Sequence, residues 1–147
     1  MPLTRGSLQI RSADPAVAPE IRINYLATEV DRTANVEGLK ILRKILRAPA
    51  LKPYMVEEVD PVDRACSDEA LLSHCRARGS TIYHPTSTCR MGSDPLAVVD
   101  QRLRLRGIEG LRVVDASVMP DLVSGNTNAA VIMIAEKAAD MILQDAR

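Results

Sequence analysis

Two segments near the start of the chain alternate polar and apolar residues, which is typical of β-strands with one buried face. They span residues 7–12 and 20–25. Gly6 and the pair Asp14-Pro15 bound the first segment with residues that favour turns. Because the two segments follow each other with only a loop between them, we expect a pair of half-buried antiparallel strands.

Apolar residues then recur at the spacing of a helix. The first predicted helix runs from about residue 29 to residue 47, with Thr28 as its N-cap and Pro49 beyond its end. A second predicted helix follows Ser67, whose hydroxyl suits an N-cap, and ends at Gly79, a residue type common at helix C-termini.

The last part of the chain is its most apolar region. Residues 111–115 have the pattern of a buried strand that ends at Asp115, and a final helix is predicted from about residue 127 to residue 144. The first half of this helix, residues 129–135, is apolar on every side, so we expect it to be enclosed within a larger body. The order of elements predicts an α+β fold in which residues 1–147 form one domain.

Composition limits what the core and the surface can be. The 147 residues include no Phe, no Trp and three Tyr, so the core must consist of Leu, Ile, Val, Ala and Met. Lys and Arg number 19, as do Asp and Glu, and this balance gives no support to nucleic-acid binding, which needs a basic surplus. The densest basic patch has its arginines two positions apart, which we interpret as the solvated face of a strand. Its members are Arg102, Arg104, Arg106 and Arg112.

Three cysteines, Cys66, Cys75 and Cys89, are present without a C-x-x-C pair. An odd number without that spacing indicates neither a disulfide framework nor a zinc site, so we expect reduced thiols in a cytoplasmic protein. The first residues lack the apolar core of a secretory signal, and no run of about 18 apolar residues occurs. We therefore expect no transmembrane segment.

One histidine lies in a setting that suits chemistry. His84 follows a short β-prone run and precedes Pro85, which favours an extended backbone at the histidine. Because an imidazole changes charge near neutral pH, His84 is a candidate general base, although a hydrogen-bonded structural histidine has the same local sequence. His74 lies inside the second predicted helix and is interpreted as an ordinary helix residue.

A polar segment, residues 124–128, opens the final predicted helix. Backbone N–H groups in the first turn of a helix carry partial positive charge, so this end could bind an anion or stabilise negative charge on a cofactor. Simple capping by Asn126 or Thr127 explains the same residues. Asp115 is also open to two interpretations, because a carboxylate at a strand end can line a ligand site or organise the following turn.

Three motifs occur in a specific order along the second half of the chain. They are a His-Pro turn that ends in Cys-Arg-Met-Gly (83–92), Leu-Arg-Val-Val-Asp-Ala-Ser (111–117), and Gly-Asn-Thr-Asn (125–128) before an Ala-Glu-Lys-Ala-Ala-Asp helix. In these motifs the chain resembles the C-terminal region of the glucose–methanol–choline (GMC) family of FAD-dependent oxidoreductases. The resemblance begins at residues 5–15 and covers nearly the whole chain.

The resemblance implies two catalytic residues. His84 matches the active-site base of the family, which accepts the hydroxyl proton of an alcohol while the hydride from its C–H bond passes to the flavin N5. Asn126 matches the second active-site position, which is His in some members and Asn in others and hydrogen-bonds the substrate oxygen. The implied function is oxidation of a small-molecule alcohol to an aldehyde.

The resemblance also implies residues that bind FAD. Asp115 and Ala116 match a segment that lies along the phosphate and ribityl portion of the cofactor. Thr127 and Asn128 match the helix start that faces the pyrimidine edge of the flavin. The first strands and the long helix would belong to the substrate domain. The strand at 111–115 and the last helix would belong to the FAD-binding domain.

This sequence departs from the family pattern in two ways. Family members are several times longer and carry a Gly-rich FAD fingerprint near their N-terminus, whereas this chain has no G-x-G-x-x-G. We therefore expect a partial chain that needs an FAD-binding half or a partner chain, and that is inactive alone. The run Thr86-Ser87-Thr88 also replaces the more usual Val-Gly-Thr. A non-catalytic binding or assembly module, a split-enzyme subunit and a degraded gene product remain as alternatives.

Overall fold

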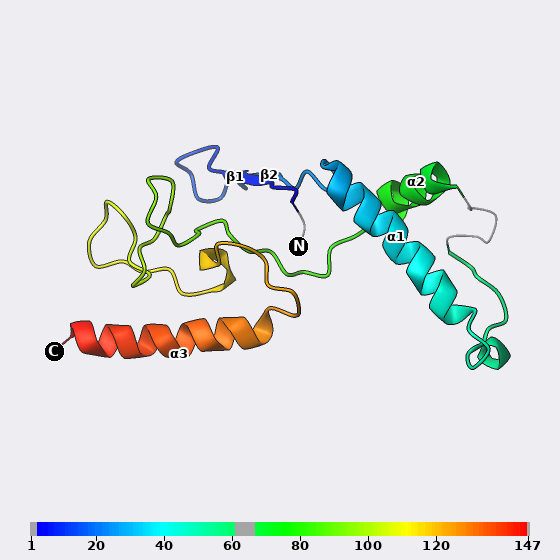
Figure 1. The fold of residues 1–147 in the computed structure, drawn as a ribbon. Helices are drawn as coiled ribbons and strands as arrows, with labels where there is room; N and C mark the ends of the chain where they lie inside the picture. Colours follow the sequence, from blue (N-terminus) through cyan, green and yellow to red (C-terminus); the bar gives the residue numbers. More distant parts are fainter. Residues whose placement is uncertain (1–2, 61–66, 147) are drawn as a thin grey trace. The chain divides into compact units, whose positions relative to one another are not determined.

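The computed structural model describes residues 3–60 and 67–146. The chain has an α+β fold and divides into two compact units, an N-terminal unit that ends at Thr81 and a C-terminal unit that starts at Ile82 (Figure 1). The prediction of one domain over residues 1–147 stays a prediction, and each unit is described by itself. The prediction for Cys66 lies outside the described residues, whereas Cys75 and Cys89 are free thiols.

The N-terminal unit opens with the predicted antiparallel pair of strands. β1 (Ser7–Gln9) pairs with β2 (Glu20–Arg22), and Leu8 lies opposite Ile21 in the register. The prediction that these strands are half-buried is wrong for this structure, because the side chains of Leu8 and Ile21 are 48% and 66% exposed. Alternation along the chain predicted the strands, but it does not reveal whether anything covers their apolar face.

The long helix forms where the sequence predicts it. α1 covers Glu29–Leu46, and Thr28 is its N-cap, with the Thr28 hydroxyl accepting a 3.2 Å hydrogen bond from the backbone N–H of Asp31. The Asp31 carboxylate is itself buried, and it accepts hydrogen bonds from the backbone N–H groups of Leu3 (2.9 Å) and Thr4 (2.7 Å) and from the Thr4 hydroxyl. The start of α1 therefore anchors the first residues of the chain.

The second helix packs beside the first. α2 covers Asp68–Arg78, and the Ser67 hydroxyl caps it by accepting from the backbone N–H of Ala70 at 3.1 Å. Val36 of α1 and Leu71 of α2 are buried, which gives the two helices an aliphatic interface. Hydrophobic burial rather than intrinsic propensity therefore holds this helical pair together.

The end of α2 also follows the prediction. Gly79 is the C-cap, and a Cβ at this position would lie 2.3 Å from the backbone oxygen of Cys75, so no other residue fits without a shift. Near the other end of α2, the Lys40 ammonium lies 2.6 Å from Asp68 and 2.7 Å from Glu37. The pair with Asp68 links the two helices across their exposed edge, whereas the pair with Glu37 lies within α1.

The C-terminal unit is built around one helix and a set of turns. α3 covers Asn128–Asp145, and its buried face packs on the segments between residues 91 and 119. The buried side chains of this core are all aliphatic or Met, as the composition requires: Val99, Leu103, Val118, Met119, Ile134 and Ala138. The absence of Phe and Trp from the sequence therefore leaves a core that is assembled from aliphatic side chains and Met.

One prediction for this unit is wrong. Residues 111–115 do not form a buried strand, since only an isolated bridge between Arg104 and Arg112 forms there and Asp115 is exposed. The enclosure of α3 within a larger body stays a prediction, because this chain leaves the outer face of the helix uncovered. Apolar side chains on its outer face are between 45% and 63% exposed, namely Ile132, Met133, Ile142 and Leu143. Within the described part of the chain, no helix is both long and apolar enough to cross a lipid bilayer.

Candidate active site

The His84 segment is irregular backbone rather than the end of a strand. Two residues with left-handed backbone, Tyr83 (φ 61°) and Ser87 (φ 73°), flank it, and His84 itself is half-buried. Bulky residues seldom adopt positive φ, and such strained positions concentrate at functional sites. The β-prone run before His84 therefore gives way to irregular backbone with a left-handed residue on each side of the histidine.

The Cys-Arg-Met-Gly end of the same motif is held by a bidentate ion pair. The Arg90 guanidinium donates to both oxygens of Asp94, at 2.8 and 2.6 Å. A Cβ at Gly92 would lie 2.9 Å from Asp94 Oδ2 and 3.1 Å from Arg90 Nη1, so glycine lets this pair close over the backbone. The Arg90 hydrogen bonds hold the pKa of the Asp94 carboxyl below its usual range.

Backbone hydrogen bonds join this motif to the second one. The N–H of Cys89 donates to the oxygen of Ser117 (3.0 Å), and the N–H of Met91 donates to the oxygen of Val118 (2.8 Å). Val118 is fully buried in the core. The segment after His84 is therefore fixed against the segment after Asp115.

The third motif meets His84 through a side chain. Thr127 Oγ1 lies 2.8 Å from His84 Nδ1, and Thr127 is only 7% exposed. Thr127 occupies the N-cap position of α3, but its side chain makes no capping hydrogen bond. The Thr127 side chain therefore does not cap α3. Sequence reasoning missed its contact with the imidazole, because no local pattern links residues 43 positions apart.

The two asparagines of this motif lie at the start of α3, and both are exposed. Asn126 precedes Thr127 directly, so its backbone is one residue from the hydrogen-bond partner of His84. Asn128 is the first residue of the helix. The convergence of the Asn126 carboxamide with the imidazole stays a prediction, as do the contacts expected of Thr127 and Asn128 with a flavin.

Asp115 organises the turn that follows it. Its carboxylate accepts a 2.7 Å hydrogen bond from the backbone N–H of Ser117 and caps the short 3-10 helix η2 (Ala116–Val118). The turn-forming alternative is thus what the geometry shows, and Asp115 is exposed rather than at the end of a buried strand. Ala116 is half-buried and packs against the core. The cofactor contact expected of Asp115 and Ala116 stays a prediction.

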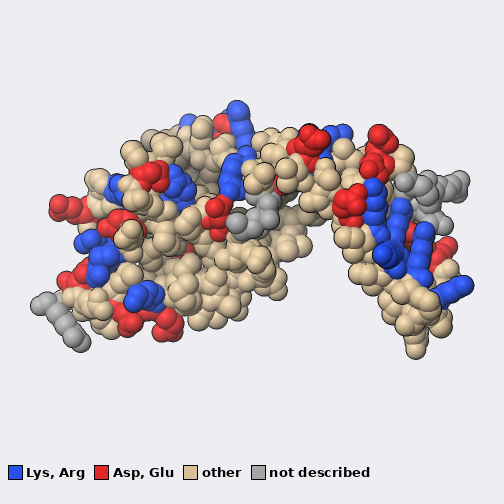
Figure 2. Space-filling model, in the orientation of Figure 1, with Lys and Arg blue, Asp and Glu red and all other residues tan. Residues whose placement is uncertain are grey.

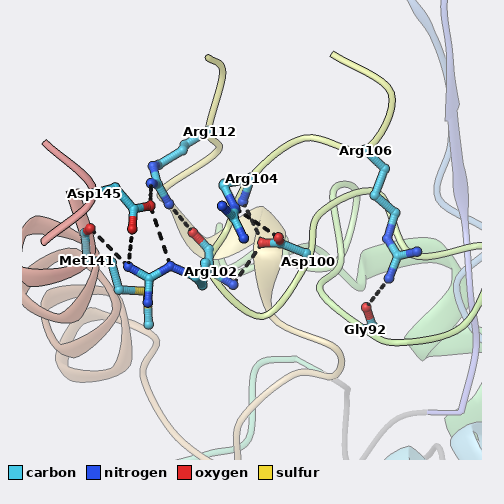
Figure 3. A network of polar contacts seen from close by, with 8 residues as sticks. All are labelled: Gly92, Asp100, Arg102, Arg104, Arg106, Arg112, Met141 and Asp145. Atoms are coloured by element: carbon cyan, nitrogen blue, oxygen red, sulfur yellow. Dashed lines mark hydrogen bonds and ion pairs between the residues drawn. The ribbon is translucent and has the colours of Figure 1, made fainter. Parts of the chain in front are cut away.

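The arginine patch is a network rather than a plain solvated strand face. Figure 3 shows Arg102 and Arg112 converging on Asp145, while Arg104 pairs with Asp100. The hydrogen bonds of Arg112 and then Arg102 hold the pKa of the Asp145 carboxyl below its usual range. The solvated interpretation fits the exposed Arg104 and also Arg106, which donates to the backbone oxygen of Gly92 at 2.7 Å.

His74 differs in one respect from the ordinary helix residue that the sequence predicts. Its Nδ1 lies 3.3 Å from an Asp60 oxygen, and Arg78 Nε lies 3.2 Å from the other oxygen of the same carboxylate.

On the face that Figure 2 shows, acidic and basic side chains lie beside one another in each unit. Within residues 3–60 and 67–146, no group of three or more His, Cys, Asp or Glu side chains is placed to hold a metal ion.

Comparison with known proteins identifies the family of this chain. The GMC oxidoreductase family model for the C-terminal region matches residues 2–135. The chain belongs to the GMC oxidoreductase family. This confirms the resemblance that the three motifs carry, and the ordered motifs are therefore those of a GMC C-terminal region.

Relatives of this GMC chain include alcohol and choline dehydrogenases. It is 46% identical over 144 residues to the alcohol dehydrogenase [acceptor] of Pseudomonas putida, covering 98% of this chain and 26% of that protein. It is 47% identical over 139 residues to the oxygen-dependent choline dehydrogenase of Pseudomonas syringae pv. syringae (strain B728a), covering 95% of this chain and 24% of that protein. The chain thus spans about a quarter of the length of these curated relatives.

A solved structure of the same family has the same fold over this region. An FAD-dependent oxidoreductase from Chaetomium thermophilum superposes with a TM-score of 0.92 at 30% identity, covering 99% of this chain and 26% of that one. The two units described above are therefore those of a GMC C-terminal region.

Proposed function

We propose that this chain is the C-terminal catalytic portion of an FAD-dependent oxidoreductase that acts on the CH–OH group of a small-molecule alcohol. The observation that carries the proposal is the contact between Thr127 and His84. It brings the only histidine of the three motifs to the residue next to Asn126, at the start of a helix. A base and an amide beside a helix N-terminus are the groups that alcohol oxidation next to a flavin requires.

The residues at the start of α3 fit a flavin. The first-turn N–H groups of an 18-residue helix have no intrahelical acceptors and carry partial positive charge. The Thr127 side chain makes no cap hydrogen bond with them. Such donors suit an anionic ring edge. The solved Chaetomium thermophilum relative is FAD-dependent. Bound FAD would supply the hydride acceptor.

The residues of this chain would bind, orient and move a proton. His84 would accept the hydroxyl proton of the alcohol, and Asn126 would hold the substrate oxygen in place. Around the cofactor, we propose that Thr127 and Asn128 face the flavin ring through the helix start. Asp115, through the turn that it organises, and Ala116 would lie along the ribityl and phosphate portion.

The proposal also assigns parts of this chain to two different domains and includes a partner. The N-terminal unit would contribute to the substrate domain, and residues 111–115 with α3 would pack in the FAD-binding domain. An FAD-binding segment, in the same polypeptide or a partner chain, would cover the exposed apolar face of α3. A cytoplasmic location stays a prediction that rests on the cysteine pattern.

The proposal is tested with a chimera in which this chain replaces the matching quarter of the Pseudomonas putida relative. We expect the chimera to bind flavin and the flavin to bleach when an alcohol is added without oxygen. His84→Ala should slow the bleaching by about 10²–10⁴-fold, the usual contribution of a general base, while flavin stays bound. His74→Ala is the matched control and should bleach at the unmodified rate. Equal rates for the His84→Ala and unmodified chimeras would contradict the proposal.

The isolated chain provides a second test. Purified with added FAD, it should show no protein-bound flavin absorbance. A bound flavin spectrum that bleaches with an alcohol would refute the expectation that another segment must supply the cofactor site.

One observation favours a non-catalytic assembly module, namely the exposed apolar face of α3. An assembly module would let the chimera fold and bind flavin, but no alcohol would bleach it. The same experiment therefore separates the two functions.

A further inference from the structure

Thr127 uses its hydroxyl in an unusual way for a residue at a helix start. A threonine at an N-cap ordinarily accepts a hydrogen bond from the second or third backbone N–H of its helix. Here the hydroxyl instead lies 2.8 Å from His84 Nδ1, and no capping bond forms. The Thr127 side chain therefore contacts the imidazole and leaves the N–H groups of the helix start without a bond from this hydroxyl.

The partnership has two possible proton arrangements. A neutral imidazole carries its proton on either Nδ1 or Nε2, and a hydroxyl can accept or donate. If Thr127 accepts from Nδ1–H, then Nε2 of His84 has a free lone pair. If Thr127 donates to Nδ1, then Nε2 carries the proton and cannot accept another while the ring stays neutral.

We propose that Thr127 is a positioning residue that holds His84 in the Nδ1–H tautomer by accepting its proton at Oγ1. This inference rests on the proposed function, because only a base needs the lone pair on Nε2. It is distinct from a flavin contact of Thr127, which would come from the helix start, whereas the side chain acts on His84. The hydroxyl decides which ring nitrogen faces the substrate as a proton acceptor.

The surroundings of Thr127 hold its side chain in place. The residue is nearly buried, and its branched Cβ restricts rotation about χ1. Its backbone oxygen accepts from the N–H of Val131 at 2.9 Å, and α3 continues into the core through Ile134 and Ala138. The hydroxyl is therefore fixed to a helix that packs into the core of the C-terminal unit.

His84 is constrained from its own side as well. The left-handed residues Tyr83 and Ser87 set the path of its backbone. The ring is then held from two directions. The backbone path sets the position of the His84 Cα, and the Thr127 hydroxyl contacts Nδ1. The remaining nitrogen, Nε2, is the one left for a substrate.

The test is nuclear magnetic resonance of the ¹⁵N-labelled 147-residue chain, which contains only two histidines. His74→Gln assigns the His84 ring signals by elimination. Long-range ¹⁵N–¹H spectra above the pH at which the ring protonates then show which nitrogen carries the proton. We expect the Nδ1–H tautomer in the unmodified chain and in Thr127→Ser, which keeps the hydroxyl. Thr127→Val, which keeps the shape, should lose most of the Nδ1–H population.

Three results would overturn the inference. One is an Nε2–H ring in the unmodified chain, and another is an unchanged tautomer in Thr127→Val. The third is a Thr127→Ser variant that loses the Nδ1–H population as fully as the valine variant does. Circular dichroism shows whether Thr127→Val folds, and if it does not, Thr127→Ser and the unmodified chain still decide the matter.

The tautomer measurement needs no flavin, so it is independent of the chimera test. If the chimera fails to oxidise alcohols but His84 is Nδ1–H, the proposed function fails and the contact stands. If the chimera is active but His84 is Nε2–H, only the role of Thr127 fails.

Discussion

Arg102 Nη2 lies 2.6 Å from Asp145 Oδ1, although the two residues are 43 positions apart. Arg112 binds the other carboxylate oxygen, and Arg102 also donates to the backbone oxygen of Met141 at 3.1 Å (Figure 3). A carboxylate at the C-terminal end of a helix is unfavourable in the field of the helix dipole. The two guanidinium groups offset that field and tie the turns after residue 98 to the last turn of α3.

Neutralising Asp145 should loosen this attachment. Asp145→Asn leaves Arg102 and Arg112 without their shared counter-charge, and Arg112 has a side chain only 17% exposed. We expect a melting temperature that is lower by several degrees, measured by circular dichroism. Asp140→Asn removes the same charge from an exposed position on the same helix and should melt close to the unmodified chain. Equal melting of the two variants would show that the network contributes no stability.

Asp31 should make the N-terminal unit sensitive to acid. The Thr4 hydroxyl and the backbone N–H of Leu3 hold the pKa of the Asp31 carboxyl below its usual range, although burial opposes this. Since the folded pKa is lower than the unfolded one, the stabilisation is complete above the unfolded value of about 4 and is lost as pH falls below it. Asp31→Asn should therefore unfold more easily at pH 7 than the unmodified chain.

The difference in stability between Asp31→Asn and the unmodified chain should shrink when thermal unfolding is followed from pH 7 down to pH 3. Asp14→Asn, at an exposed loop position, is the control and should follow the unmodified chain across this range. A constant difference at every pH would mean that Asp31 acts through its shape rather than through its charge.

Ser87 should be replaceable by glycine with a gain in stability. It has φ 73°, where a side chain costs about 1–2 kcal/mol relative to glycine. Glycine loses about 0.5–1 kcal/mol in backbone entropy, so Ser87→Gly should stabilise the fold by roughly 0.5–1 kcal/mol in urea unfolding. Ser93→Gly, at an exposed position outside the left-handed region, should destabilise it slightly. A loss of stability in Ser87→Gly would mean that its 3.1 Å hydrogen bond to Thr86 outweighs the strain.

The helices of this protein were predictable because their signals are local. A cap and the N–H that it binds are three residues apart, as at Thr28 with Asp31 and Ser67 with Ala70. The resulting helices begin and end within one or two residues of the predicted positions. The ordered motifs around His84 and Asn126 likewise indicated the family from the sequence alone.

The prediction that failed depends on contacts with distant residues. The apolar run before Asp115 predicted a buried strand, yet a strand needs a partner along its length, and residues 111–115 find only an isolated bridge. The partner of such a strand is not encoded within the segment itself. The enclosure of α3 also depends on what packs on its outer face, and it stays a prediction.

The sequence by itself determined the helices, the antiparallel strand pair and the aliphatic core, because each follows from composition or from spacing over a few neighbouring positions. Only the tertiary structure decided that Thr127 contacts the imidazole, that Asp115 serves its own turn, and that Asp145 gathers two arginines. The contacts of Thr127 and Asp145 join distant positions. Such contacts depend on how the chain returns on itself, and side-chain pattern alone does not specify that path.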